Sequence, residues 1–134
     1  MADAVLNQTL YQGVKKLITH YQNVSDNSGC TTTVVDVSAL EKDTLVNSCA
    51  TVTLNKIWFS VSMTAKVDAV KLMWDADTDA CFLTVEQTGF LDYSSIGGVK
   101  NNEATNYTGD VKIVMPACTA NDSATITCEW LKNY

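Results

Sequence analysis

The stretch Asp75-x-Asp77-x-Asp79 is the part of the chain whose residue types and spacing come closest to a known chemistry. Glu86 stands twelfth when Asp75 is counted first, and a calcium-binding EF-hand loop carries acidic ligands at its first, third, fifth and twelfth positions. The sixth position is Ala80, where such a loop needs glycine for its sharp turn. These residues leave two hypotheses open: a metal site at Asp75, Asp77 and Asp79, or a solvated acidic turn.

The sequence on either side favours the turn. An EF-hand needs a helix on each flank, but both flanks alternate apolar and polar residues with the period of a β-strand. An extended chain advances ~3.3 Å per residue, which would carry Glu86 roughly 20 Å from Asp75 and too far away to close a cage. The pattern therefore predicts a β-hairpin with strands at 67–74 and 80–86 and a turn at 75–79. We expect no metal and no cofactor.

Arrangements typical of enzymes are as weakly represented. His20 is the only histidine, and the nearby Ser25 and Asp26 lie in a predicted loop. The chain contains no G-x-S-x-G, no H-E-x-x-H and no phosphate-binding P-loop sequence. A lone histidine on a strand is usually a polar surface residue or a hydrogen-bonded core residue. We predict no catalytic residues and a protein that is not an enzyme.

Composition excludes further classes. The chain has 134 residues, which suits one domain, with nine lysines, no arginine, fifteen acidic residues and a net charge of −6. Nucleic-acid binding depends on cations that neutralise phosphates, so we expect no nucleic-acid partner. No apolar run approaches the ~20 residues that span a bilayer, and we expect no membrane association. Residues 1–12 carry no positive charge and no apolar core, which predicts synthesis in a cytoplasm without a secretory signal.

The five cysteines form no C-x-x-C pair, so a zinc ribbon or a thioredoxin-type site is not expected. Their odd number and the lack of a signal predict reduced thiols, with a disulfide formed after release from the cell as the alternative. Two of them, Cys81 and Cys128, lie in strand-like runs and are predicted to be buried.

Apolar and polar residues alternate with a period of two along most of the chain, and this alternation predicts β-strands as the elements that position the candidate residues. Residues 51–64 alternate, and the phase slips by one near Asn55-Lys56, as it would at a β-bulge. Seven or eight strands at regular spacing predict an all-β fold, an antiparallel β-sandwich that is jelly-roll-like or immunoglobulin-like. Besides the hairpin and residues 51–64, strands are expected at 14–24, 31–37, 110–115 and 124–131.

The first residues fall outside this pattern. We predict an extended N-terminal arm at 1–12 and a single β-sandwich domain at 13–134, although the four-residue spacing of Leu6, Leu10, Val14 and Ile18 also suits a helix. An apolar arm could drape over a neighbouring subunit, or it could add a strand or helix to the same core. The candidate interface residues, for contact with another subunit, are Val5, Leu6, Leu10 and Tyr11 of the arm and Tyr107 of the long loop at 94–109.

Six stretches, taken in order, carry a family resemblance. The sequence resembles a family of small structural proteins of tailed bacteriophages, particularly those of marine and cyanobacterial hosts. The family favours SDGTGE where this chain has SDNSGC at 25–30, and the chain adds Asn133-Tyr134 at its end. The matching stretches are NVSDNSG (23–29), VVDVSAL (34–40), LNKIWFSVSM (54–63), VKLMWDADTDA (70–80), GFLDYSSIGGVKNN (89–102) and TGDVKIVM with ACTANDSATITCEWLK (108–115 and 117–132).

This resemblance implies a non-enzymatic virion structural protein. The expected role is that of a capsid cement or decoration protein, made in the host cytoplasm, which binds the outside of the major capsid shell. Its expected partners are the major capsid protein and further copies of itself, as a trimer or dimer.

The alternative is a tail- or fibre-associated surface domain that binds host-cell glycans. Such a domain would present exposed aromatic rings, for which Tyr93 and Tyr107 are the candidates, whereas Trp58 and Trp130 are predicted to be core residues.

Overall fold

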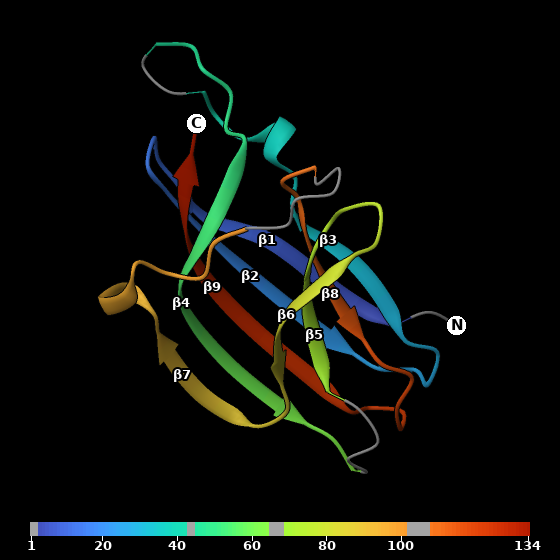
Figure 1. Ribbon diagram of the computed structural model, residues 1–134. Coiled ribbons are helices and arrows are strands. Elements are labelled where there is room, and N and C mark those ends of the chain that lie inside the picture. The colour runs from blue at the N-terminus through green and yellow to red at the C-terminus, as the bar shows by residue number, and fades with distance from the viewer. Residues whose placement is uncertain (1–2, 43–44, 65–68, 102–107) are drawn as a thin grey trace.

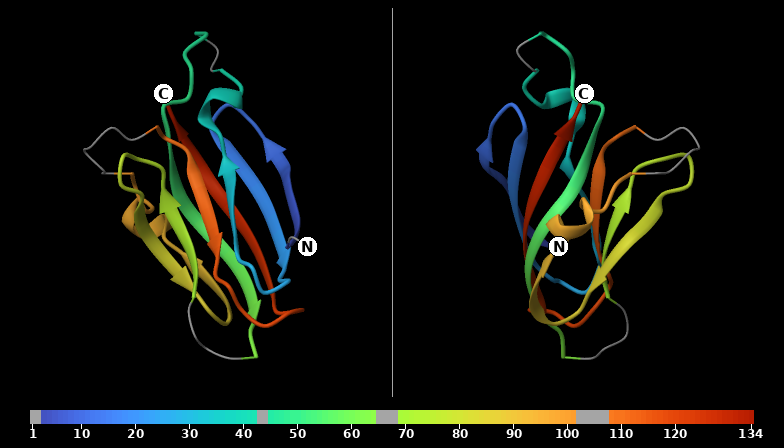
Figure 2. Two further views of the ribbon diagram at one scale, coloured as in Figure 1. Left: turned by 90° about the vertical axis from the view of Figure 1, so that its right-hand side faces the viewer. Right: turned by 60° about the vertical axis from the view of Figure 1, so that its left-hand side comes forward.

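The computed structural model describes residues 3–42, 45–64, 69–101 and 108–134, and in these ranges the chain forms two antiparallel sheets that pack face to face (Figures 1 and 2). The five-stranded sheet has the order β1-β2-β9-β4-β7 and the four-stranded sheet the order β3-β8-β5-β6. The strands of the two sheets are, in chain order, β1 (Ala4–Gln12), β2 (Lys16–Val24), β3 (Cys30–Val35), β4 (Thr51–Ser62), β5 (Val70–Trp74), β6 (Ala80–Val85), β7 (Thr88–Asp92), β8 (Val111–Met115) and β9 (Ser123–Asn133).

The core lies between the sheets because every second residue of the central strands points inward. In β9, Ala124, Ile126, Cys128 and Trp130 are buried, as the alternation predicts. Trp130 is fully buried, and its ring lies edge-on to Trp74 of the opposite sheet at a centroid distance of 6.5 Å. Aromatic side chains thus join the two layers.

The predicted all-β antiparallel sandwich is confirmed, and two local predictions are confirmed with it. β5 and β6 form the expected hairpin, with the acidic turn between Trp74 and Ala80. The register of β4 against β9 shifts between Leu54 and Lys56, where the sequence pattern slipped by one residue.

The described part of the chain forms nine strands rather than the seven or eight expected. Residues 4–12, expected as an arm, pair with β2 along their length and form an edge strand, which was the alternative weighed for this segment. β7 was not predicted, because it is short and contains Gly89. Two short 3-10 turns, Val37–Ala39 and Ser94–Ile96, complete the described elements.

Two burial predictions were wrong for the same geometric reason. Trp58 is exposed because Ile57 and Val61 occupy the inner face of β4, and alternation turns Trp58 outward. Cys81 is exposed because its neighbour Phe82 points inward and stacks on Trp74 at 3.8 Å between ring centroids. Cys128 is buried as predicted, and burial raises its pKa.

Candidate functional site

Lys112 lies between two carboxylates of the acidic turn. Its Nζ is 2.8 Å from Asp75 Oδ1 and 3.1 Å from Asp79 Oδ2. The second oxygen of Asp75 accepts a hydrogen bond of 2.8 Å from the hydroxyl of Thr108. Asp77 is exposed in the same turn, and Glu86 follows the far end of β6. An internal ammonium group therefore contacts two of the oxygens that a calcium site would have used.

The electrostatics of the turn agree with this arrangement. The Lys112 ammonium, followed by the Thr108 hydroxyl, holds the pKa of Asp75 below its usual value. The same ion pairs, with Asp75 first and Asp79 second, raise the pKa of Lys112. Within the described ranges, no three His, Cys, Asp or Glu side chains are placed to share a metal ion. The turn is a structural ion-pair cluster that links the β5–β6 hairpin to β8.

Replacing Lys112 by methionine is expected to change how stability depends on pH. A lowered Asp75 pKa contributes stability above the unfolded-state value of about 3.9, and this contribution is lost as the pH falls through the folded-state value. We expect Lys112→Met to lose up to about 1 kcal/mol per ion pair at pH 7 and to match the wild type in acid. Urea unfolding from pH 7 to pH 2 measures this difference. Lys15→Met, at an exposed lysine outside the cluster, is the control and should shift both ends of the curve equally.

The predicted polar residues around His20 do not form a catalytic set. The Nδ1 atom of His20 lies 2.9 Å from the Thr127 hydroxyl on the neighbouring strand. Ser25 and Asp26 instead bond within their own turn, where they accept hydrogen bonds from the backbone of Asn27 and Ser28. The structure thus assigns His20 to the outer face of the five-stranded sheet.

That outer face carries an exposed aromatic pair. Trp58 of β4 and Phe90 of β7 are register partners, and their rings stack with centroids 5.1 Å apart and planes inclined by 28°. Trp58 is 42% exposed and Phe90 50% exposed. We call this pair the aromatic shelf.

A shallow depression of about 290 Å³ adjoins the shelf, and it is lined by uncharged side chains. Two hydroxyl contacts order its rim: Ser60 Oγ lies 3.1 Å from Thr88 Oγ1, and Thr127 is held by His20. The lining residues are Trp58, Phe59, Ser60, Thr88, Gly89, Thr125 and Thr127.

Charges on the same face are grouped further along the strands. Glu129 Oε1 lies 2.9 Å from Lys16 Nζ, and its Oε2 accepts a hydrogen bond of 3.0 Å from Asn55. Burial alone would raise the pKa of Glu129, but the hydrogen bonds from Lys16 and Asn55 together outweigh burial and lower it. Lys56, 4.0 Å from Glu129, is also the register partner of Asp92. This end of the face is therefore a compensated network of opposite charges.

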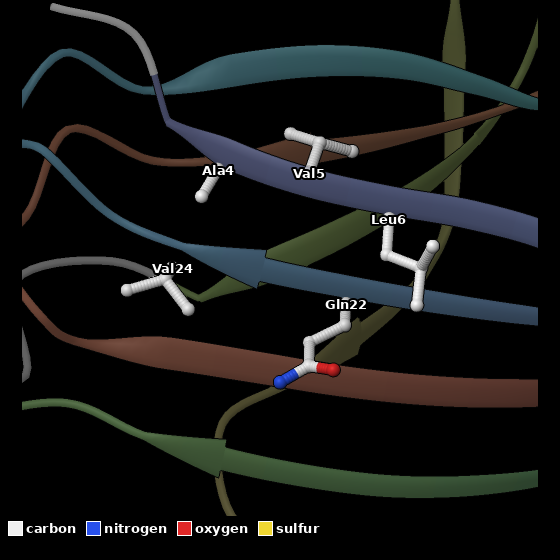
Figure 3. Close-up of a pocket in the computed structure, with 5 residues that line it drawn as sticks. All are labelled: Ala4, Val5, Leu6, Gln22 and Val24. Atoms are coloured by element: carbon white, nitrogen blue, oxygen red, sulfur yellow. The ribbon is translucent and has the colours of Figure 1, made fainter.

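The second exposed surface is β1. All its residues from Ala4 to Tyr11 are exposed, including the predicted interface residues Val5, Leu6, Leu10 and Tyr11. Figure 3 shows the shallow groove at its start, where Leu6 pairs with Gln22 and Ala4 with Val24. Tyr107, the remaining predicted interface residue, lies outside the described residues.

The comparisons with known proteins add no identification: no family model, no curated protein and no solved structure matches this chain. Among the described residues, no helix is long and apolar enough to cross a membrane.

Sequence reasoning missed the aromatic shelf, although one signal was present. The phase slip at Asn55-Lys56 already placed Ile57 on the inner face and therefore Trp58 on the outer one. Phe90 gave no comparable signal because its short strand was not predicted. Tyr93 was predicted as an exposed aromatic ring for glycan binding, but it is half-buried and packs against the core.

Proposed function

We propose that this chain is a non-enzymatic structural protein of a tailed-phage virion, a capsid cement or decoration protein that binds the outside of the major capsid shell. The order of the sequence motifs supports this assignment, and one observation about β1 supports the mode of binding. The protein would be made in the host cytoplasm and function in the virion. A net charge of −6 favours solubility before assembly.

The supporting observation is an edge strand that has no strand partner on its outer side among the described residues. β1 has nine residues, none of them charged and none a proline, and it ends the five-stranded sheet. Natural proteins usually guard such an edge with lysine, proline or a covering segment, because its unpaired backbone groups attract another strand. The register shift between Thr9 and Tyr11 leaves a regular stretch from Ala4 to Thr9. An edge of this kind suits strand addition by a partner chain.

The other sheet edges are less suited to this role. β7, at the opposite edge of the same sheet, has five residues, contains Gly89 and ends at Asp92. The edges of the four-stranded sheet, β3 and β6, have six residues each. β1 combines the greatest length among these edges with exposed apolar side chains on both of its faces. It is therefore the edge we assign to contact with the capsid shell or with a second copy of the chain.

Quantitative mass spectrometry of purified particles of the encoding phage tests the proposal. We expect about one copy per major capsid protein, or one per local threefold axis. The matched experiment adds back the purified double variant Leu6→Lys, Leu10→Lys to particles that lack the protein. Charges at these exposed positions should lower its copy number well below that of the wild type.

The control is Val14→Lys, an exposed position just beyond β1, which should bind as the wild type does. Absence of the chain from purified particles would overturn the structural role. A double variant that binds with full occupancy would overturn the assignment of β1.

A further inference from the structure

The geometry points to the aromatic shelf as a binding site for a neutral carbohydrate, with one pyranose ring of a polysaccharide stacked on Trp58. This inference is independent of the capsid role of β1, since the shelf lies at β4 and β7 and β1 is the opposite edge strand of the sheet. Three properties of the shelf carry it: the exposure of the rings, the hydroxyl rim and the distribution of charge.

Trp58 is the one tryptophan of the three whose side chain is exposed. The other two tryptophans, Trp74 and Trp130, are 4% and 0% exposed. Trp58 instead stacks on Phe90, and the pair presents neighbouring aromatic surfaces to solvent. A contiguous exposed apolar patch, such as these two stacked rings form, marks a binding site more often than a single exposed apolar residue does. An aromatic face carries partial negative charge and attracts the polarised C–H groups of a sugar ring.

The rim supplies the polar half of carbohydrate recognition. Four hydroxyl side chains line the depression, and each can both donate and accept a hydrogen bond. Sugar hydroxyls have the same double capacity, so the two sets are complementary. His20 at Thr127 and the contact between Ser60 and Thr88 hold part of the rim in a fixed arrangement. The volume of about 290 Å³ is just below the ~300–1,000 Å³ range for small-ligand sites, which suits a site that holds a single sugar ring.

The charges on this face select a neutral ligand. None of the seven lining residues is ionised at neutral pH. Lys56, two positions from Trp58, faces Asp92 across the strands and Glu129 on its other side. No uncompensated cation in the described part of this face is placed to hold a phosphate, sulfate or carboxylate group. A neutral glucan, mannan or galactan fits these properties better than an acidic polysaccharide.

Affinity electrophoresis tests the site directly. The purified chain is run through gels that contain a soluble glucan, mannan or galactan, with alginate as the acidic comparison. We expect at least one neutral polysaccharide to retard the wild type and to quench its tryptophan fluorescence. Trp58→Ala should weaken binding at least about tenfold, as truncation of an aromatic hot spot does. Trp58→Tyr, which keeps a ring, should retain part of the binding.

Matched variants distinguish loss of polysaccharide binding at the shelf from misfolding and from loss of binding to the capsid. Thr125→Val removes a rim hydroxyl with little change in shape and should weaken binding several-fold. Leu6→Lys, Leu10→Lys should bind polysaccharide as the wild type does, and Trp58→Ala should keep its copy number on particles.

Circular dichroism and thermal unfolding establish that each variant is folded. Failure of all neutral polysaccharides to retard the wild type, or retardation by alginate alone, would overturn the inference. A Trp58→Ala variant that binds polysaccharide normally but loses its place on particles would show that the shelf contacts protein instead.

Discussion

Replacing Trp130 by alanine is expected to lower the free energy of unfolding by about 3–5 kcal/mol, the usual cost of deleting a large buried aromatic side chain. Trp130 lies on β9, a central strand, and contacts Trp74 and Phe82 of the opposite sheet edge-on. Its indole N–H donates a hydrogen bond of 3.0 Å to the buried hydroxyl of Thr19. The substitution therefore opens a cavity between the sheets and leaves a buried hydroxyl without its partner.

Guanidinium unfolding followed by circular dichroism measures this loss. Domains are stable by only about 5–15 kcal/mol, so the variant is expected to be partly unfolded at 37 °C. The matched control is Trp58→Ala, which removes the same side chain from the outer face and should cost far less. Equal losses for the two variants would contradict the central position of Trp130 in the core.

Replacing Gly109 by alanine is the second change with a large expected effect. Gly109 has φ +91°, and a side chain in the left-handed region costs about 1–2 kcal/mol. A Cβ at this position would also overlap the backbone carbonyl oxygen of Ala50 and lie 3.1 Å from Val37 Cγ2. Backbone cannot swing aside as a flexible side chain can, so the overlap should cost about 1–3 kcal/mol more.

Gly97→Ala isolates the two contributions. Gly97 has φ +86°, but among the described residues beyond its two chain neighbours no heavy atom lies within 4 Å of the position of its missing Cβ. This control therefore carries the conformational cost alone, and the difference between the two variants reports the clash with Ala50. Thermal unfolding of both proteins gives that difference, and equal midpoints would show that the segment around Gly109 can shift without cost.

Elements with one buried face were readable from the sequence. The hairpin around the acidic turn and the bulge in β4 both follow from period-two alternation, because a strand with one face in the core has an apolar residue at every second position. β1 leaves no such mark, since both of its faces are exposed, and its residues were expected as an arm. β7 is short and mostly exposed, so it too lacked a pattern.

The candidate sites depend on spatial relations that the pattern does not contain. Lys112 approaches Asp75 because β8 lies beside β5. The spacing of residues within either strand does not predict that the two strands pair. The shelf and its rim combine Trp58, Phe90, Thr127 and His20 from strands that are distant in the chain. Alternation places Trp58 on the outer face, but only the strand order supplies its neighbours.

The central position of β9 also has a consequence for the order in which the molecule assembles. β9 separates β2 from β4 and hydrogen-bonds to both, yet the ribosome makes it after every other strand that the structure describes. The larger sheet cannot close while β9 is still within the exit tunnel. Closure of the larger sheet is therefore expected to come late, to be dominated by contacts between distant segments and to be slow for that reason. Until then β2 and β4 expose edges that a chaperone or a neighbouring nascent chain can occupy.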